Sequence, residues 1–405
     1  MTTARALKAP QWPQRTSDAG IGCYVHLPFC HRICPYCDFS VVVYDERRSV
    51  RYLSALLHEI GRMPAPATLQ TLYFGGGTPS LLPVSHIDRL AAALRSRPAE
   101  EAERSFRDHP GAIEFTMEAN PARDASDLSA WLQARVNRLS IGVQSFDDRE
   151  LHALGRDHTA EQALKFYEAA RAVGFDNISL DLIAGSPGQT IESFKRSVTT
   201  AVACGADHVS VYGLAIEDNT PYAAWHGRDP RAFPDDDAVA AALEIADDIL
   251  TDAGFIHYEL SNFARPGFEC AHNIGYWRQR DCIAYGLSAS GYRAGLRYRN
   301  LRSFDAYCNA VEREQEPREE EERLGFAARV GEAAMLALRL REGIEYADFR
   351  RRFAIDPERA FARAVKKCLA ADLLEVDGES VRLSKRGRLL ANSVCAEFLA
   401  PDLSS

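Results

Sequence analysis

The sequence predicts an α/β protein that combines an open, partial (β/α)6 barrel with a small C-terminal α+β domain that is winged-helix-like. Between residues 21 and 225, short β-branched or aromatic runs alternate with longer amphipathic stretches, which is typical of parallel strands joined by helices. Six such repeats are too few for a closed eight-stranded barrel. Near the C-terminus, helical segments precede a short hairpin, which indicates a second, smaller domain.

The expected elements follow one another along the whole chain. The predicted barrel strands are Cys23–Leu27, Thr71–Phe74, Ile113–Glu118, Arg138–Gln144, Asn177–Ala184 and His208–Ala215. The amphipathic segments between them include Arg47–Arg62, His86–Arg95, Ala160–Val173 and Ile191–Cys204. Later helices are expected at Asp235–Ala253, Val330–Arg339, Tyr346–Phe353 and Pro357–Ala370. A hairpin over Leu373–Leu383 is expected to turn at Asp377-Gly378.

Composition shifts divide the chain into five parts. They are a disordered tail at 1–20, the barrel core at 21–225, a connecting or lid region at 226–311, a charged linker at 312–323 and the C-terminal domain at 324–405. The stretch 312–323 is crowded with Glu and Arg around Pro317, so we expect a solvated helix or a linker there that marks a domain boundary. The arginines of the last domain are interspersed with acids, which favours a packing or lid role over DNA binding.

The composition of the 405 residues, 46% hydrophobic and 26% charged, is that of an ordinary soluble globular protein. The net charge of −9 argues against broad nucleic-acid binding. No apolar run approaches the length of a membrane span, and the first twenty residues lack a secretory signal. The ten cysteines are scattered and therefore suit a reducing compartment. We expect a cytoplasmic protein.

Three cysteines lie within eight residues directly after the first predicted strand, as Cys30-x₃-Cys34-x₂-Cys37. A closed zinc site needs a fourth ligand, which His26, His31 or a distant cysteine would have to supply, and this spacing fits neither common zinc pattern. A 4Fe–4S cube held by three thiolates instead leaves one iron free for another ligand. The cysteine loop therefore favours an iron–sulfur cluster over zinc.

The carboxyl ends of the next strands carry unusual polar or glycine residues, where barrel enzymes place their chemistry. Gly75–Ser80 follows the second strand, and its glycines let backbone approach a ligand, although a tight turn without a ligand has the same composition. Glu118, Gln144 and Asp181 belong to the next three strands, and Arg156 lies beyond the fourth. For both carboxylates a helix N-cap or an internal salt bridge is the alternative. Asp181 stands in an apolar strand, where a buried charge must be paired.

The cysteine loop resembles that of the radical S-adenosylmethionine (SAM) superfamily. A more specific resemblance, to the coproporphyrinogen-dehydrogenase-related group, rests on Tyr24–Cys30, Gly75–Ser80, Gly142–Phe146, Gly155-Arg156 with His158, Asp181–Ile183 and Tyr258–Ala264. It implies a 4Fe–4S cluster on Cys30, Cys34 and Cys37. It also implies SAM contacts by Tyr24, Tyr36, Gly76, Gly77, Thr78, Glu118, Gln144, Arg156, Asp181 and Ala215.

Two departures separate this sequence from the oxygen-independent coproporphyrinogen III dehydrogenases of that group. Those enzymes carry a further cysteine where this chain has Phe39, and a longer N-terminal extension than the short stretch before Ile21. Both departures fit the HemW branch, whose members are heme chaperones with a His-Asn-x-x-Tyr-Trp motif, here His272–Trp277. From residue chemistry alone, His272 is either a hydrogen-bonded structural residue or an axial heme ligand. The resemblance implies heme binding.

The resemblance thus implies a chaperone that binds heme and passes it to an acceptor protein, carrying a 4Fe–4S cluster and SAM. The alternative is radical oxidative decarboxylation of two propionates of coproporphyrinogen III, an activity that the two departures argue against. A third possibility is a binding module whose cysteine loop holds structural zinc. We expect neither nucleic acid nor a membrane span, whereas peripheral membrane association and a homodimer stay open.

Overall fold

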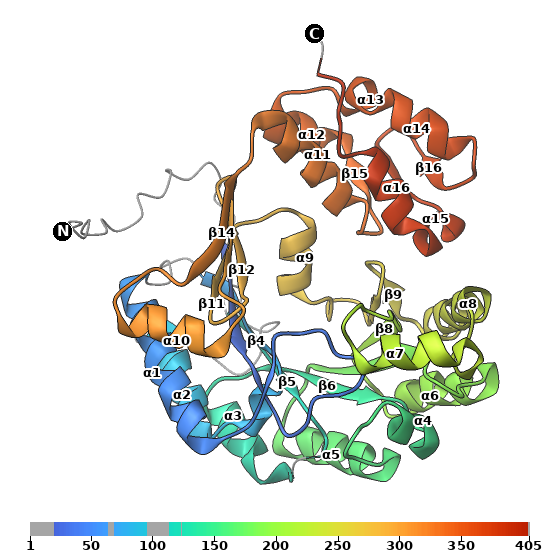
Figure 1. Ribbon diagram of the computed structural model, residues 1–405. Coiled ribbons are helices and arrows are strands. Elements are labelled where there is room, and N and C mark those ends of the chain that lie inside the picture. Colours follow the sequence, from blue (N-terminus) through green and yellow to red (C-terminus); the bar gives the residue numbers. More distant parts are fainter. Residues whose placement is uncertain (1–19, 64–68, 95–112, 123, 404–405) are drawn as a thin grey trace, which may run out of the picture.

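A twelve-stranded sheet dominates the computed structural model, which describes residues 20–63, 69–94, 113–122 and 124–403 (Figure 1). The strand order is β14-β13-β12-β11-β1-β4-β5-β6-β7-β8-β10-β9. The seven central strands are parallel: β11 (Cys282–Tyr285), β1 (Ile21–Leu27), β4 (Leu69–Gly76), β5 (Glu114–Ala119), β6 (Arg138–Gln144), β7 (Ile178–Ala184) and β8 (His208–Gly213). The six predicted barrel strands and the open sheet are confirmed, and β11 adds a seventh. The predicted tail at 1–20 lies outside the described residues except for Gly20. Arg95, the last residue of the predicted helix His86–Arg95, also lies outside them.

Antiparallel strands extend both edges of the parallel sheet. At one edge lie β9 (Ile256–His257) and β10 (Asn262–Ala264), and at the other lie β12 (Ser290–Arg293), β13 (Leu296–Asn300) and β14 (Arg318–Arg323). The expectation of a solvated helix or linker at 312–323 is therefore wrong for β14. Directly opposite pairs such as Arg297 with Glu322 form ion pairs across β13 and β14, so the charged run is a strand stabilised by its neighbour.

Helices cover the outer face of the parallel sheet, as Figure 1 shows for α1 to α6. They are α1 (Glu46–Arg62), α2 (Val84–Leu94), α3 (Leu128–Gln133), α4 (Asp148–Ala153), α5 (Ala160–Val173), α6 (Ile191–Ala203), α7 (Pro221–Arg228), α8 (Asp236–Asp252) and α10 (Phe304–Glu312). The outward strand residues, such as Val25, Phe74 and Met117, are buried in one apolar core beneath the helices. The inward residues are largely polar, as on β7, where Ser179 and Asp181 alternate with apolar residues. Strand alternation thus separates an apolar outer face from a polar interior.

A second apolar core, from Val330 to Phe398, belongs to the C-terminal helices and hairpin. Its elements are α11 (Phe326–Ala337), β15 (Ile344–Glu345), α12 (Tyr346–Phe353), α13 (Pro357–Ala360), α14 (Ala362–Leu369), β16 (Leu374–Val376), β17 (Ser380–Leu383), α15 (Lys385–Leu389) and α16 (Ala391–Glu397). The predicted helix at Pro357–Ala370 is split at Phe361. The predicted hairpin is confirmed, and its Gly378 has a φ of 87°. Helices with a small sheet confirm the predicted fold class.

Helix α9 (Ala271–Trp277) lies between the sheet and the C-terminal helices (Figure 1). It contacts β4 on one side and α11 on the other. None of the helices in the described ranges combines the length and apolar character that crossing a bilayer requires. The segment that carries the His-Asn-x-x-Tyr-Trp motif thus packs between the sheet and the C-terminal helices, with His272 buried and the rest of α9 partly exposed.

Glu59 joins α1 to the β11–β13 edge of the sheet, and we predict that Glu59→Leu lowers the free energy of unfolding by about 3 kcal/mol. Its buried carboxylate accepts hydrogen bonds from Gly286 N–H at 2.9 Å, Asn300 Nδ2 at 2.8 Å and the Tyr307 hydroxyl at 2.5 Å. The substitution leaves these buried donors without an acceptor. Urea unfolding measures the change, and His58→Leu, on the exposed side of the same helix, serves as control. Equal losses in both variants would contradict the prediction.

Candidate cofactor site

The three cysteines lie on one loop at the carboxyl end of β1. A short parallel pair, β2 (Phe29–Cys30) with β3 (Val42–Val43), closes this loop at its base. Inside it the Cys37 N–H donates to the Cys34 carbonyl at 3.1 Å, and all three thiols are partly buried. Burial raises the pKa of the Cys30 thiol to about 11, and the thiols of Cys34 and Cys37 are close enough to raise it further. The loop therefore gathers three thiols on one side of the barrel mouth.

No three His, Cys, Asp or Glu side chains in the described ranges converge on one point as a single metal ion requires. In an iron–sulfur cube each thiolate binds its own iron, so the thiols need to surround a larger object. Three partly exposed thiols on one loop fit that requirement.

The cysteine loop is anchored to the segment that follows β6. The Tyr222 N–H at the start of α7 donates to the Pro35 carbonyl at 3.1 Å. The Pro35 ring packs so tightly on Gly155 that a Cβ there would lie 2.7 Å from Pro35 Cδ. Next to this contact, Arg156 Nη1 lies 3.8 Å from Cys34 Sγ. The loop is thus held with a guanidinium beside one of its thiols.

Arg156 brings a basic group to this end of the barrel. Its Nη2 donates to the Gly142 carbonyl at 2.9 Å, which fixes the side chain across the end of β6. Its Nε is buried and has no hydrogen-bond partner in the described part of the chain. A cation with an unused buried donor is suited to receive a carboxylate or a cluster sulfur.

The glycine segment after β4 packs directly against the start of the cysteine loop. The Gly77 N–H donates to the Leu27 carbonyl at 2.9 Å, and Thr78 Oγ1 lies 3.7 Å from Cys30 Sγ. Gly76 has a φ of 112°, and a Cβ there would meet the His26 ring at 2.5 Å. These glycines are therefore required by the packing of β4 against β1, and they place Thr78 beside the thiols.

Glu118, at the end of β5, binds the neighbouring strand. It accepts hydrogen bonds from the Gly76 N–H and the Tyr73 hydroxyl, each at 2.9 Å. Burial raises the pKa of this carboxyl to about 7, although both hydrogen bonds oppose the shift. Glu118 caps no helix in the described ranges, so the helix-cap alternative does not describe it.

Asp181, in the middle of β7, is paired by hydroxyl groups. It accepts from Ser140 Oγ and Ser179 Oγ, each at 3.0 Å at the closest approach. Burial raises the pKa of this carboxyl, and the surrounding serines oppose the shift. Gln144 ends β6 with a φ of 68°, an uncommon conformation for a residue other than glycine. Glu118, Gln144 and Asp181 thus come from three adjacent strands of one sheet.

The remaining predicted SAM residues are placed less uniformly. Tyr24 lies inside the barrel, where its hydroxyl is 3.0 Å from His26 Nδ1 and its ring centroid 6.1 Å from that of Tyr73. Tyr36 lies on the cysteine loop with its ring centroid 6.0 Å from that of Tyr222. Ala215 is exposed just beyond β8.

His272 lies at the opposite, amino-terminal end of the strands and is 4% exposed. Its Nδ1 is 2.7 Å from Thr71 Oγ1, its Nε2 is 3.1 Å from the Tyr276 hydroxyl, and its ring stacks on Tyr73 with centroids 5.1 Å apart. Burial lowers the pKa of this imidazole to about 3, and the charge of Arg138 adds to the effect. Both ring nitrogens are therefore engaged in the conformation observed.

Sequence reasoning missed the residues that hold α9 at this end. Glu114, at the start of β5, is 1% exposed and accepts from the N–H groups of Ala271 at 2.9 Å and His272 at 3.0 Å. Arg138, at the start of β6, is equally buried, and Glu114 is among the groups whose charges act on it. The available signal was a charged residue near the start of two predicted strands, second in Ile113–Glu118 and first in Arg138–Gln144, on the inward side of the alternation.

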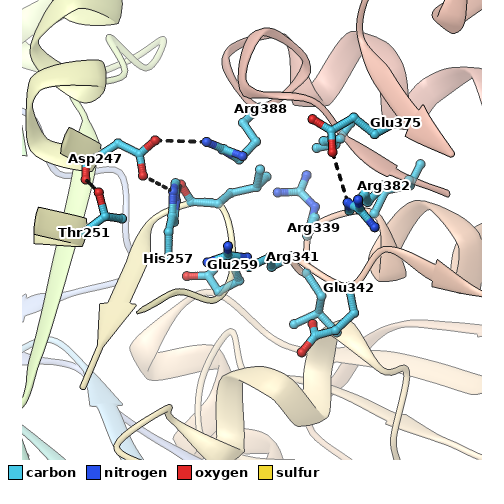
Figure 2. A pocket seen from close by; sticks show the side chains of 14 residues that line it. Asp247, Thr251, His257, Glu259, Arg339, Arg341, Glu342, Glu375, Arg382 and Arg388 are labelled. Atoms are coloured by element: carbon cyan, nitrogen blue, oxygen red, sulfur yellow. Dashed lines mark hydrogen bonds and ion pairs between the residues drawn. The ribbon is translucent and has the colours of Figure 1, made fainter. Parts of the chain in front are cut away.

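A cavity of about 660 Å³ lies between α8, the β9–β10 turn and the C-terminal hairpin (Figure 2). Asp247 binds both His257 Nδ1 at 2.9 Å and Arg388 at 3.0 Å, and Glu375 pairs with Arg382 at 3.1 Å. Some of its charged groups thus pair with one another, whereas Glu259 Oε1 is buried without a hydrogen-bond partner in the described ranges. None of the predicted cluster, SAM or heme residues lines it.

Comparison with known proteins places this geometry in a family. The family model described as Radical SAM superfamily matches residues 24–201, and that of the HemN C-terminal domain matches residues 327–390. A protein named heme chaperone HemW from Lactococcus lactis is 36% identical, over 94% of this chain and 98% of its own. The chain belongs to the HemW family. Two further relatives carry the same name. The HemW protein of Mycobacterium tuberculosis is 38% identical over 93% of this chain and 94% of its own, and that of Bacillus subtilis is 32% identical over 93% of this chain and 98% of its own.

A solved structure supports the fold of this HemW family member. Coproporphyrinogen III oxidase (HemN) from Escherichia coli, described as a radical SAM enzyme, is 24% identical with a TM-score of 0.80. The match covers 94% of this chain and 90% of that chain. At this identity the likeness establishes a shared radical SAM fold.

The raised pKa of Glu118, about 7 against an ordinary 4.5, makes a prediction for the cluster-free protein. Because the folded state binds this proton more tightly than the unfolded chain, the contribution of Glu118 to stability is present below pH 4.5 and is lost as pH rises to about 7. In Glu118→Gln this loss disappears. The stability of the variant relative to the parent should thus increase by up to about 3 kcal/mol across that range. Urea unfolding at several pH values measures it, and parallel pH profiles would contradict it.

Proposed function

We propose that this protein is a cytoplasmic heme chaperone that holds a 4Fe–4S cluster on Cys30, Cys34 and Cys37 and binds SAM at the same end of the barrel. The observation that carries the proposal is the meeting of the cysteine loop with Arg156, whose Nη1 lies 3.8 Å from Cys34 Sγ and whose buried Nε is unused in the described chain. Family membership supports it, since the relatives are named heme chaperone HemW.

The side chains around the loop offer what SAM would need. Arg156 would pair with its carboxylate, and Glu118 and Asp181 would accept from its amino group and ribose hydroxyls. Thr78 and Gln144 would add polar contacts from adjacent strand ends. When bound, the cluster can supply an electron to the sulfonium group of SAM, and these residues orient SAM for that transfer.

Heme is proposed to bind through α9, with His272 as the candidate iron ligand. Because both nitrogens of His272 are engaged by Thr71 and Tyr276, ligation requires that one of these hydrogen bonds is given up. Helix α9 has only seven residues, so a local displacement of this helix is sufficient. We also propose that heme passes to a separate acceptor protein and that residues 324–405 form a packing or lid domain.

The second candidate function is the oxidative decarboxylation of coproporphyrinogen III, which the structural likeness to HemN of Escherichia coli favours. The same loop carries an observation against it. Phe39, two positions after Cys37, is 67% exposed where those enzymes are expected to carry another cysteine. The chaperone is therefore the better-supported function.

We predict that changing any of the three loop cysteines to serine reduces the iron bound after anaerobic reconstitution from about four atoms per chain to a small fraction, because three thiolates are the minimum set for the cube. Cys204→Ser, at a partly buried cysteine on the last turn after α6, should keep full iron content. Addition of SAM should change the electron paramagnetic resonance spectrum of the reduced parent protein. Iron retention by Cys34→Ser, or replacement of iron by zinc in the parent, would overturn the cluster assignment.

We predict opposite effects of two substitutions on heme binding. His272→Ala should weaken binding at least about tenfold, because the iron loses its axial ligand. Thr71→Val should not weaken it, because this change removes the hydrogen bond that competes with iron for the His272 imidazole. Heme titration followed by the Soret band measures both, and unaltered affinity in His272→Ala would contradict the assignment.

The same anaerobic preparation separates the two candidate functions. With SAM, a reductant and coproporphyrinogen III, we expect no vinyl product. Formation of vinyl groups would establish the dehydrogenase instead.

A further inference from the structure

A chain of hydrogen bonds crosses the barrel interior from the start of α9 to Asp181. The Cys270 N–H, at the N-cap of α9, lies 3.3 Å from the Tyr258 hydroxyl, which is 2.9 Å from His208 Nε2. His208 Nδ1 lies 2.8 Å from Ser179 Oγ, and Ser179 Oγ lies 3.0 Å from Asp181 Oδ1. These contacts run from the N-cap of α9, at the amino-terminal end of the barrel, to Asp181 in the middle of β7.

The protons in this chain can be arranged in only one direction. The Tyr258 oxygen accepts from the Cys270 amide, which is always a donor, so the Tyr258 proton needs an acceptor. His208 Nε2 is the acceptor that the structure offers. His208 then carries its proton on Nδ1 and donates to Ser179, whose own proton goes to the Asp181 carboxylate. In the reverse arrangement the Tyr258 proton would have no acceptor in the described part of the chain.

The cost of burial indicates that these groups are present for their hydrogen bonds. His208 is 1% exposed, Tyr258 is 4% exposed and Ser179 is fully buried. Without a hydrogen-bond partner, each of these buried polar groups would destabilise the fold, whereas apolar side chains at the same inward positions would need no partner. Burial also keeps His208 neutral, because it lowers the pKa of the imidazole well below its ordinary value.

We propose that His208 and Tyr258 are positioning residues that fix the hydrogen bonding of Asp181 and couple it to the position of helix α9. The inference rests on the proposed function, in which Asp181 contacts SAM and α9 contacts heme. A second, independent link runs alongside, because Tyr73 stacks on His272 and donates to Glu118. Binding at either end of the barrel is therefore sensed at the other.

The mechanism of the coupling is a change of histidine tautomer. When α9 moves, water takes the place of the Cys270 amide beside Tyr258 and accepts the Tyr258 proton, so this hydroxyl no longer needs His208 Nε2 as its acceptor. The His208 tautomer with its proton on Nε2 is then favoured, because this N–H can donate to the Tyr258 oxygen. In that tautomer Nδ1 is an acceptor. Ser179 turns its hydroxyl toward Nδ1, and Asp181 loses that hydrogen bond.

SAM affinity of anaerobically reconstituted protein tests the positioning role. His208→Leu should weaken SAM binding about tenfold, and Tyr258→Phe by a smaller factor. His208→Asn should recover most of the affinity, because its amide N–H can replace the Nδ1–H bond to Ser179. Tyr298→Phe is the matched control, since it removes another buried tyrosine hydroxyl. That hydroxyl accepts from the Ala284 N–H at 3.0 Å and donates to the Ala284 carbonyl at 3.2 Å, away from His208 and Asp181. Equal affinities in His208→Leu and the parent would overturn the proposal.

Two further measurements keep the proposal falsifiable if a variant folds poorly. Nitrogen-15 resonances of labelled histidine in the parent should show His208 protonated at Nδ1 and not at Nε2, with His208→Asn used for assignment. The ratio of heme affinities with and without SAM should differ from one in the parent and approach one in Tyr258→Phe. An Nε2 proton in the parent, or an unchanged ratio, would refute the coupling. If the parent binds neither SAM nor heme, the proposed function fails instead.

Discussion

The structure depends on the requirement that the inward face of a largely parallel sheet carries polar side chains that must be paired. Outward residues such as Val25 and Phe74 bury apolar surface under the helices and supply most of the stabilisation. Inward residues such as Ser140, Ser179 and His208 are equally inaccessible and are tolerated because they bind one another. This pairing extends along the barrel. Near α9, the Glu114 carboxylate accepts hydrogen bonds from two backbone N–H groups, and at the barrel mouth the Glu118 carboxylate accepts one from the Gly76 N–H.

The two ends of the barrel are built differently, and the difference bears on function. At the carboxyl ends of the strands, glycines and a loop leave three thiols partly accessible beside Arg156. At the amino ends, α9 closes the barrel, and His272 is enclosed by Thr71, Tyr73 and Tyr276. The thiols of the first end are thus partly exposed, whereas both ring nitrogens of His272 at the second end are already hydrogen-bonded. Helix α9 is thus held in its place by the protein's own hydrogen bonds, through Glu114 and Thr71.

Sequence reasoning succeeded where a local pattern determines the structure. The six barrel strands have period-two or continuous apolar patterns, and α5 was placed correctly because its apolar positions recur at helical spacing. Asp181 was recognisable because a carboxylate in an apolar strand needs a partner, and three cysteines in eight residues are rare by chance. The reasoning failed for elements that form only because they pair with a segment distant in the sequence. Strand β11 has four residues and β14 is nearly all charged, so neither is evident until its neighbour is known. The partners of His208 and Glu114 likewise come from distant segments.

Strand β14 forms one free edge of the sheet and presents four consecutive glutamates, Glu319 to Glu322. An open edge exposes backbone groups that another molecule could use to extend the sheet. A second β14 approaching this edge would bring carboxylates against carboxylates, with the arginines of β13 already bound within their own chain. Like charges at that spacing repel, so intermolecular sheet growth, and with it fibrous aggregation, is opposed at its starting point. The glutamates of β14 therefore keep separate copies of the chain from polymerising through this edge, even at high concentration.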